Sequence, residues 1–231
     1  MSNKNVFLEK YFLMTRSEEN YLKTIFHLGG GDSKSITTNA IAEQMETKPS
    51  SVTDMAKKLS EKGLVDYVRY QGVSLTDAGV KTALSIIRKH RLWEVFLVKK
   101  LDFSWDEVHE VAEQLEHIKS EKLIDKIDEL LEFPKHDPHG DPIPTKDGKF
   151  QERDEKLLSE MAINSQGVCV GVKDSSVPFL KFLDKNKIAL GNTIKVLDKE
   201  DFDNSLRIQM DGKEMRISHQ IAANLYVKKN D

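Results

Sequence analysis

Apolar positions in the first third of the chain follow a helical period and then an alternating one. The spacing predicts a helix within residues 15–33 that stops at a run of glycines, a short helix over residues 37–45, and a third helix that opens at Pro49 and ends at Gly63. Residues 64–76 alternate around a Gln-Gly turn, which predicts a two-stranded hairpin. This order of elements is typical of a winged helix-turn-helix, whose third helix enters the DNA major groove, although small adaptor domains can share it.

The middle of the chain is predicted to be helical. Helical periods cover residues 77–101 and 120–131, and Ser104 is suited to cap a further helix that runs to about residue 118. Together these helices amount to about 50 residues, which is too few for an independent core of much depth. We therefore expect them to pack on the first domain, on a partner subunit, or on both.

The last third of the chain has a different composition. Residues 133–150 hold four of the six prolines, which predicts a connector with little regular structure, and the stretch over residues 151–161 is expected to start with a helical turn. From about residue 162, short β-like runs recur and are broken by Gly, Asn and Asp, with one short helix between the first two runs. This pattern predicts a small barrel of the SH3 type.

Composition limits the kinds of binding partner and the cellular compartment that we expect for the protein. The net charge of −3 gives no overall attraction to nucleic acid, so DNA binding has to come from a local patch. The single cysteine, Cys169, excludes an internal disulfide framework, suggests a reducing compartment, and lies in an apolar run typical of a buried thiol. No apolar run approaches the length of a membrane span, and the N-terminal residues are too polar for a secretory signal. We expect a cytoplasmic protein without a membrane partner.

The predicted third helix supplies the surface that would face DNA. Its short hydroxyl side chains can approach bases and phosphates closely, and basic side chains can contact phosphates. The residues expected at this surface are Lys48, Pro49, Ser50, Ser51, Thr53, Asp54, Lys57, Lys58 and Arg69. Residues 34–75 carry six basic and five acidic side chains, a net charge of +1. A solvated helix face explains so weak a charge equally well, so the order of elements is what favours DNA binding.

Six potential metal ligands lie close together in the sequence. They are His90, Glu94, His109, Glu113, Glu116 and His117. On a regular helix the first two would lie about 40° apart and the last four would share an arc of roughly 100°. Any one of these residues alone is more often a partly buried or solvent-facing polar side chain. Together, beside apolar stripes, they would be costly to bury empty, so a divalent cation is the expected partner.

Motifs for catalysis do not accompany these ligands. The chain lacks Glu-x-x-His pairs at this cluster, His-Glu-x-x-His, a P-loop and a Ser/His/Asp set. The run of glycines at residues 29–31 has no strand before it, so it predicts a helix end instead of a nucleotide-binding loop. We therefore expect that the protein is not an enzyme.

Several motifs together resemble the metal-dependent repressors typified by the diphtheria toxin repressor and the manganese transport regulator. Over about residues 15–145 the resemblance rests on the strings SEENYLKTIF, PSSVTDMAKKLSEKGLV, LTDAG, RKHRLWEVFL, VHEVAEQLEH and DPHGDPIP. Over residues 160–231 the strings VPFLKFLDKNKIALGNTIKV and ISHQIAANLYV are similar to the SH3-like module of some members.

The resemblance implies a homodimer that represses metal-uptake genes at palindromic operators when it is loaded with a divalent metal. The fold expected from it is mainly α with small β parts. Its parts would be a winged helix-turn-helix DNA-binding domain in residues 1–76, a helical metal-binding and dimerisation domain in residues 77–145, a linker over residues 146–160 and an SH3-like, FeoA-like β-barrel in residues 161–231.

The resemblance also assigns an activating metal site. This site would take Glu113, Glu116 and His117 from the second dimerisation helix and Asn20 from the first helix of the chain. Iron-type members have Cys in place of Glu113, whereas manganese-type members have Glu. Members carry Met or Asp in place of Asn20, whose carbonyl oxygen can still ligate a hard ion. Lys23 stands where manganese-type members carry a second carboxylate, which counts against a two-metal arrangement.

An ancillary site is implied by the same resemblance. It would consist of His90, Glu94 and His109, and the SH3-like module would complete it with Asp174, the acidic residue near the matching stretch. Ligands that supply oxygen and imidazole nitrogen without thiolate suit Mn²⁺ or Fe²⁺, although other divalent transition metals can bind in vitro.

The main hypothesis is that a bound metal ties the first helix to the helix over residues 104–118 and so fixes the spacing of two recognition helices in the dimer. One alternative is a metalloenzyme or metal carrier with a helix-turn-helix-like bundle, which predicts tight metal binding without sequence-selective DNA affinity. A second alternative is a winged-helix regulator with a small-molecule effector in the barrel, which predicts that chelators do not affect operator binding.

Overall fold

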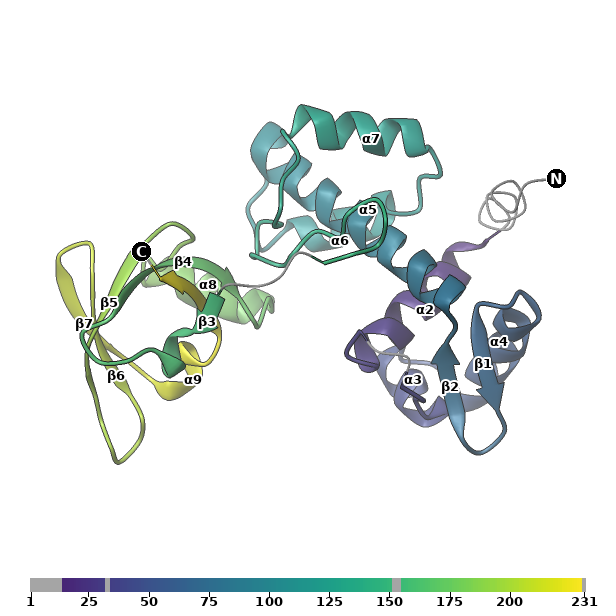
Figure 1. The fold of residues 1–231 in the computed structure, drawn as a ribbon, viewed down its shortest axis with the longest axis horizontal. Coiled ribbons are helices and arrows are strands. Elements are labelled where there is room, and N and C mark those ends of the chain that lie inside the picture. Colours follow the sequence, from purple (N-terminus) through teal and green to yellow (C-terminus); the bar gives the residue numbers. More distant parts are fainter. Residues whose placement is uncertain (1–13, 32–33, 151–154, 230–231) are drawn as a thin grey trace. The chain divides into compact units, whose positions relative to one another are not determined.

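The computed structural model describes residues 14–31, 34–150 and 155–229. The chain divides into two compact units. One contains residues 1–90, 113–126 and 144–149, and the other contains residues 91–112, 127–143 and 150–231. The 25-residue helix α5 (Asp77–Leu101), labelled in Figure 1, contributes to both units. Within the described residues, none of the helices has both the length and the apolar character that crossing a membrane requires.

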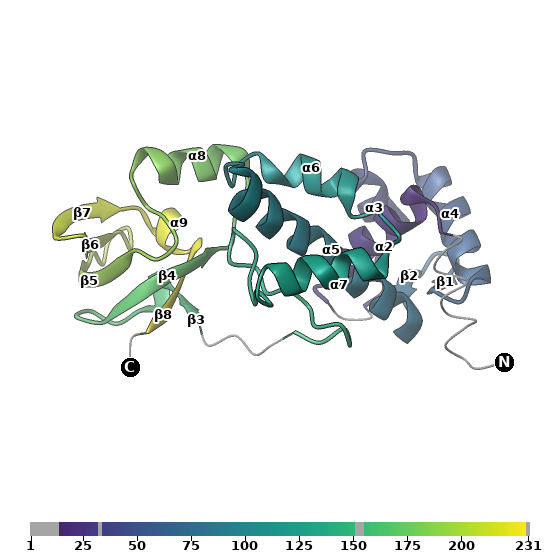
Figure 2. The ribbon, with the colours of Figure 1, turned by 90° about the horizontal axis from the view of Figure 1, so that it is seen from above.

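Three helices and a hairpin form a winged helix-turn-helix in the first unit (Figures 1 and 2). They are α2 (Arg16–Leu28), α3 (Thr38–Gln44), α4 (Pro49–Glu61), β1 (Val65–Val68) and β2 (Gly72–Leu75). Thr15 and Glu18 start α2 with a capping box, in which each side chain accepts a hydrogen bond from the backbone amide of the other residue. The helices meet in a core that includes the fully buried Leu22, Ile41 and Leu59. The predicted winged helix-turn-helix is confirmed.

A short strand contact helps to hold the hairpin to the rest of the first unit, in addition to the buried Val73 and Leu75 in the core. Ile36 and Val73 exchange backbone hydrogen bonds of 2.8 and 2.9 Å. Gly72 has a φ of +109°, and a Cβ there would lie 2.5 Å from the Ile36 carbonyl oxygen, so this close approach requires glycine. The hairpin tip exposes Arg69 and Tyr70, and the guanidinium lies 4.9 Å from the centre of the tyrosine ring.

Helix α6 (Val108–Leu115) is shorter than the sequence predicted. Residues 105–107 form a turn instead of a first helical turn. At the other end, the Ile118 amide donates a 3.0 Å hydrogen bond to the Leu115 carbonyl oxygen and closes a turn over residues 116–117. The expectation of one helix over residues 104–118 is therefore wrong, because hydrogen-bonded turns replace its first and last residues. The following helix is α7 (Glu121–Leu130).

The second unit contains a six-stranded antiparallel sheet in the order β3-β8-β4-β5-β6-β7. Its strands are β3 (Glu155–Leu157), β4 (Gln166–Val172), β5 (Thr193–Lys199), β6 (Leu206–Met210), β7 (Lys213–Ile217) and β8 (Leu225–Lys229). Helix α8 (Val177–Lys185) buries Leu180 and Leu183 in the core of the sheet, and α9 (His219–Ala222) precedes β8. The predicted C-terminal β module is confirmed, with β3 and β7 at the two ends of its strand order.

Residues 155–157 follow residues 151–154, where the helical turn expected at the start of residues 151–161 falls. They form β3, which pairs antiparallel with β8 so that Glu155 lies opposite Lys228. Only the next three residues form a helical turn, the 3-10 helix η1 (Leu158–Glu160). Pairing with a strand about 70 residues later outweighs the local helical preference, as is common for strands. Residues 151–154 lie outside the described residues.

The proline-rich connector lacks long regular elements, as predicted, but its position on β4 is fixed. The Val172 amide donates a 2.7 Å hydrogen bond to the His139 carbonyl oxygen. Gly140 has a φ of +85°, and a Cβ there would lie 2.1 Å from the Cα of Gly171, so only glycine fits. The Asp137 carboxylate accepts hydrogen bonds from the amides of His139 and Asp141, at 2.8 and 2.9 Å. These contacts hold two polar side chains, Asp137 and His139, at defined places.

Candidate metal centres and DNA-binding surface

A group of polar and charged side chains, here called the first cluster, lies inside the first unit. It comprises Glu19, Asn20 and Lys23 from α2, His90 from α5, Glu113 from α6, and Glu116 and His117 from the turn after α6. The carboxylates of Glu19 and Glu116 are fully buried. Buried carboxylates are costly unless a positive group neutralises them, so the partners of these two residues decide what the cluster can do.

Glu116 is the most connected residue of the first cluster. Its two oxygens accept hydrogen bonds of 2.7 and 2.9 Å from the Lys23 ammonium, and its Oε2 lies 2.7 Å from His90 Nδ1. The same ammonium lies 2.5 Å from Glu113 Oε1. Burial acts to raise the pKa of Glu116, but the hydrogen bond with His90 and the charge of Lys23 outweigh burial and lower it. Glu116 is therefore an anion near neutral pH, as a metal ligand has to be.

His117 and two buried oxygens complete the first cluster. His117 Nδ1 lies 2.5 Å from Glu19 Oε2, which orients the imidazole, and His117 Nε2 lies 3.9 Å from Glu116 Oε1. Glu19 Oε1 and Asn20 Oδ1 are buried and have no hydrogen-bond partner among the described residues. A bound cation would satisfy such oxygens. The available donors are carboxylate, amide and imidazole groups without a thiolate, which fits Mn²⁺ or Fe²⁺.

A second group, here called the second cluster, lies inside the second unit. It comprises Glu94 from α5, His109 from α6, and Asp137 and His139 from the connector. Glu94, Asp137 and His139 are buried and offer ligand atoms within 4.8 Å of one another. His109 Nδ1 lies 3.4 Å from Glu94 Oε1, and its side chain is 65% exposed. Two buried carboxylates and a buried imidazole at this spacing are suited to holding a divalent cation.

The orientation of His139 leaves one ring nitrogen facing the carboxylates. Its Nε2 donates a 2.7 Å hydrogen bond to the Trp105 carbonyl oxygen, and its Nδ1 lies 3.7 Å from Glu94 Oε2. Burial acts to lower the pKa of His139, but Glu94 and Asp137 outweigh burial and raise it to about 9. Burial, with the nearby charges of Glu94 and Asp141, raises the pKa of Asp137 to about 7. Without a metal, the second cluster therefore holds protons that a metal ion would displace.

The predicted ligands fall into both clusters. Glu113, Glu116 and His117 lie with Asn20 in the first cluster, as the resemblance implied. His109 does not share a helix face with Glu116 and His117, because α6 ends at Leu115 and the two later residues lie in a turn. His90, assigned by the resemblance to the ancillary site, contacts Glu116 and offers a ligand atom within 4.8 Å of those of Glu113 and Glu116.

Asp174, the ligand predicted from the SH3-like module, lies just ahead of α8. Its carboxylate accepts a hydrogen bond from the Ser176 amide at 2.9 Å, ahead of α8. The groups of potential metal ligands found among the described residues do not include it. Its role in an ancillary site therefore stays a prediction.

Sequence reasoning missed three residues of these clusters. Asp137 and His139 belong to the string DPHGDPIP, which was noted only for its prolines and as part of the resemblance. An Asp and a His two residues apart, held by neighbouring prolines and a glycine, could have been recognised as candidate ligands. Glu19 lies in the acidic first turn of α2, and nothing in the sequence distinguishes its buried position from the exposed one of Ser17.

The predicted DNA-facing residues lie on α4, at its start and on the hairpin. All of them are exposed except Thr53, which is half-buried and donates a 3.0 Å hydrogen bond to the Pro49 carbonyl oxygen. Lys57 lies 3.7 Å from Asp54 on the same helix face. Lys58 lies 3.2 Å from Glu18 Oε1 on α2, so part of its charge is already compensated. This leaves an exposed surface with short hydroxyl side chains and several cations, which is suited to a nucleic-acid backbone.

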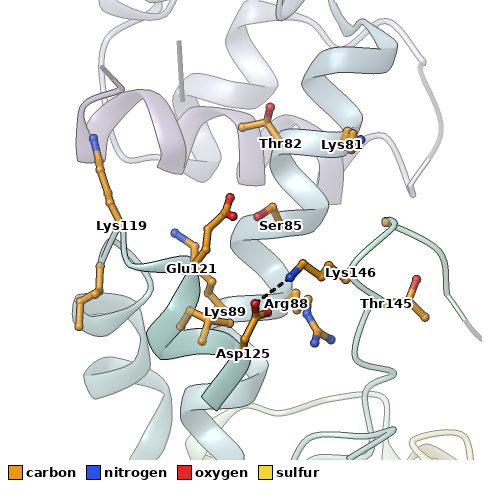
Figure 3. A pocket seen from close by; sticks show the side chains of 13 residues that line it. Lys81, Thr82, Ser85, Arg88, Lys89, Lys119, Glu121, Asp125, Thr145 and Lys146 are labelled. Carbon is orange, nitrogen blue, oxygen red and sulfur yellow. Dashed lines mark hydrogen bonds and ion pairs between the residues drawn. The ribbon is translucent and has the colours of Figure 1, made fainter. Parts of the chain in front are cut away.

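A separate cavity of about 150 Å³ in the first unit has the wrong charge for a metal (Figure 3). It is bordered by α5, α7 and residues 145–148, and its lining contains four lysines and one arginine against two acidic residues. One of these acidic residues, Asp125, is paired with Lys146 at 2.7 Å. A lining with excess positive charge repels divalent cations, so the candidate metal centres are the two clusters.

Comparisons with known proteins agree with this geometry. Residues 13–73 match the family model "Iron dependent repressor, N-terminal DNA binding domain", and residues 76–145 match "Iron dependent repressor, metal binding and dimerisation domain". Residues 156–229 match the FeoA domain. Three family models therefore follow one another along the chain.

Individual relatives show the same likeness. The chain is 35% identical to the HTH-type transcriptional regulator MntR of Oceanobacillus iheyensis, over 53% of this chain and 82% of that protein. A solved manganese-dependent transcriptional repressor in complex with manganese has a TM-score of 0.77 and 33% identity, over 92% of this chain and 100% of that one. The chain is also 33% identical to a probable metal transport system membrane protein of Chlamydia trachomatis, over 62% of its own length but only 33% of that protein.

Proposed function

Because the chain belongs to the family of iron- and manganese-dependent repressors typified by the diphtheria toxin repressor and the manganese transport regulator, we propose that it is a metal-dependent transcriptional repressor. In this proposal, Mn²⁺ or Fe²⁺ loads the protein, and a homodimer then binds a palindromic operator and represses genes for metal uptake. The metal-binding and dimerisation model matched by residues 76–145 supports the dimer, as do Leu123 and Leu130, two exposed apolar residues on α7.

The observation that carries the proposal is the position of the first cluster. Asn20 lies on the first helix of the winged helix-turn-helix, whereas Glu113, Glu116 and His117 come from α6 and the turn after it. A divalent cation supplies a single charged centre to which oxygen and nitrogen ligands from both segments can bind. In the proposal Asn20, Glu113, Glu116 and His117 hold this ion, and Glu19 positions His117.

The same helix α2 connects the first cluster to the DNA-facing helix. Glu18, next to the cluster residue Glu19, accepts a 2.7 Å hydrogen bond from Lys62 just after α4 and lies 3.2 Å from Lys58 on α4. Fixing α2 by metal ligation therefore also restricts α4. In the proposal α4 enters the major groove with its exposed Ser50 and Ser51, and the hairpin contacts the backbone.

The second cluster supplies a further metal position in this proposal. Glu94, Asp137 and His139 would hold the ion, and the exposed His109 can complete the ligand set. The connector that carries Asp137 and His139 is anchored to β4, so an ion here would rigidify the joint between the helices and the sheet of the second unit.

Replacement of Glu116 tests the proposal. A duplex is first selected from a random pool with Mn²⁺-loaded protein, and its affinity is then measured by gel shift with Mn²⁺ and with a chelator. We expect about 5- to 150-fold tighter binding with Mn²⁺, which corresponds to a coupling of about 1–3 kcal/mol. Glu116→Ala should abolish this stimulation, because it removes the central carboxylate of the first cluster, and should leave the dimer intact by gel filtration.

The matched control is Glu110→Ala, which removes an exposed carboxylate from α6, the helix just before Glu116. It should retain the full Mn²⁺ stimulation. Unchanged stimulation in Glu116→Ala would rule out the first cluster as the activating site. Operator affinity that is equal with and without Mn²⁺ in the unmodified protein would rule out metal-dependent repression.

A further inference from the structure

One residue of the first cluster cannot ligate a metal. A protonated lysine has three donors and no acceptor. The Lys23 ammonium nevertheless occupies a place that would suit an ion, because it lies 2.5 Å from Glu113 Oε1 and 2.7 Å from Glu116 Oε1. These two carboxylates and His90 form a group whose ligand atoms lie within 4.8 Å of one another, a spacing that could hold a metal ion.

We propose that Lys23 is a tethered cation that fills the position between His90, Glu113 and Glu116, so that the first cluster accepts one divalent ion and not two. This inference rests on the proposed metal-dependent function and specifies the number of ions at its central site.

Burial makes the ammonium difficult to displace. The Lys23 side chain is 12% exposed and the Glu116 side chain is fully buried. A second divalent ion at this position would take both carboxylates from the ammonium and leave a nearly buried charge without its partners. Removing one partner of a buried ion pair is costly, because the charge of the remaining partner stays desolvated. The ion pairs of Lys23 therefore exclude a second ion more effectively than the mere absence of a ligand would.

The charges of the cluster agree with a single ion. Glu19, Glu113 and Glu116 provide three negative charges when His90 and His117 are neutral. One ammonium and one divalent ion neutralise them, whereas an ammonium and two divalent ions would leave a buried excess of positive charge. Ligand atoms also remain for one ion. Asn20 Oδ1 is buried without a hydrogen-bond partner among the described residues, and His117 Nε2 faces Glu116 Oε1 at 3.9 Å.

Substitution of Lys23 tests this inference through the number of bound ions. Lys23→Glu turns three carboxylates into four, which two divalent ions can neutralise. We expect this variant to bind one more Mn²⁺ per chain than the unmodified protein in equilibrium dialysis. Its electron paramagnetic resonance spectrum should show an exchange-coupled Mn²⁺ pair, since the two ions would share Glu113 and Glu116. The unmodified full-length protein at saturating Mn²⁺ should show only isolated ions.

Two further variants make the result interpretable. Lys23→Met keeps the length of the side chain but removes the charge, so Mn²⁺ should bind the first cluster at least about tenfold more tightly once the like charge is gone. Lys122→Glu makes the same charge change as Lys23→Glu at an exposed position of α7 and should match the unmodified protein in both measurements.

The outcomes separate this inference from the function on which it rests. An exchange-coupled pair in the unmodified protein would overturn the inference, as would a folded Lys23→Glu variant that binds no additional ion. If Lys23→Glu does not fold, unchanged or weaker Mn²⁺ affinity in Lys23→Met would overturn it. If the unmodified protein binds the same number of Mn²⁺ ions as Glu116→Ala, the proposed activating site itself fails, whatever the Lys23 variants do.

Discussion

At the scale of single residues, the second cluster shows how surroundings prepare a side chain for a metal. His139 donates from Nε2 to the Trp105 carbonyl oxygen, and its ring stacks on Trp105 with the ring centres 6.5 Å apart. The remaining nitrogen, Nδ1, therefore faces Glu94 and Asp137. A fixed hydrogen bond on one imidazole nitrogen is the usual way to orient the other nitrogen for ligation.

This arrangement predicts a pH dependence. The pKa of His139 is raised to about 9 and that of Asp137 to about 7, so both groups are largely protonated at pH 6. Because Mn²⁺ has to displace these protons, its affinity for the second cluster should rise between pH 6 and 9, by up to about tenfold per pH unit for each proton released. Anaerobic Mn²⁺ titrations in the Glu116→Ala background, followed by isothermal titration calorimetry, measure this affinity.

The metal-free protein should respond to pH in the opposite direction. A raised histidine pKa in the folded state contributes stability that is complete below about pH 6.5 and is lost as the pH rises through about 9.

Replacement of His139 is the control for the Mn²⁺ titration. His139→Ala should remove the pH-dependent Mn²⁺ binding, whereas His219→Ala, at an exposed position on α9, should retain it. An Mn²⁺ affinity that does not change between pH 6 and 9 would contradict the prediction that Mn²⁺ displaces protons from His139 and Asp137.

At the scale of elements, one buried carboxylate adds a charged contact between α2 and the end of α4 to the apolar core that they share. Glu18 Oε1 accepts a hydrogen bond from Lys62, lies 3.2 Å from Lys58, and belongs to a fully buried side chain. Burial acts to raise the pKa of Glu18, but Lys62, the Thr15 amide and Lys58 outweigh burial and lower it. The contact therefore contributes stability above pH 4.5, and this contribution is lost as the pH falls through the lowered pKa of the folded state.

Glu18→Gln removes the charge and keeps an oxygen for the Thr15 amide. In chelator at pH 7 we expect it to reduce the free energy of unfolding by about 1.5–3 kcal/mol, the range for hydrogen bonds to charged groups. The loss should shrink as the pH approaches 3. Urea unfolding at several pH values measures this difference. The matched control is Asp54→Asn, which breaks the exposed pair with Lys57 and should cost no more than about 1 kcal/mol. Equal effects of the two substitutions would show that Glu18 does not tie α2 to α4.

Elements with strong local signals were predictable from the sequence, and elements fixed by distant contacts were not. The spacing of apolar residues, Pro49 and Gly63 gave the recognition helix almost to its ends, which are Pro49 and Glu61. In contrast, β3 exists because it pairs with β8, and the ends of α6 depend on turn hydrogen bonds. No local sequence pattern therefore marks β3 or the ends of α6.

The same division applies to the clusters. Glu113, Glu116 and His117 were found because they recur within a few residues, a signal that the sequence carries directly. The sequence could not reveal that the Lys23 ammonium bridges two of the predicted ligands, because about 90 residues separate them along the chain. Asp137 and His139 join Glu94 because the connector is held on β4 at Gly140 and because Arg91, three residues before Glu94 on α5, contacts the Asp137 carboxylate at 3.6 Å.

At the scale of the whole molecule, the function proposed is a coupling between two ligands. The net charge of −3 gives no general affinity for DNA, so in the proposed function operator binding would depend on a small surface of α4 and the hairpin. The first cluster is connected to that surface through α2, which carries Glu18 beside Glu19 and Asn20. Through these contacts, metal binding changes operator affinity only if the metal and the operator favour the same arrangement of α2 and α4.

Such coupling has to be reciprocal. If Mn²⁺ raises operator affinity by a given factor, the operator has to raise Mn²⁺ affinity by the same factor, about 5- to 150-fold for a coupling of about 1–3 kcal/mol. We expect Mn²⁺ titrations, with free Mn²⁺ measured by electron paramagnetic resonance, to show tighter binding with the selected duplex than with a scrambled duplex of equal length. In Glu116→Ala the two duplexes should give equal Mn²⁺ affinities. If Mn²⁺ strengthens operator binding in gel shifts while the selected duplex leaves Mn²⁺ affinity unchanged, the ion acts on the DNA or on protein assembly, and the connection through α2 is not the cause.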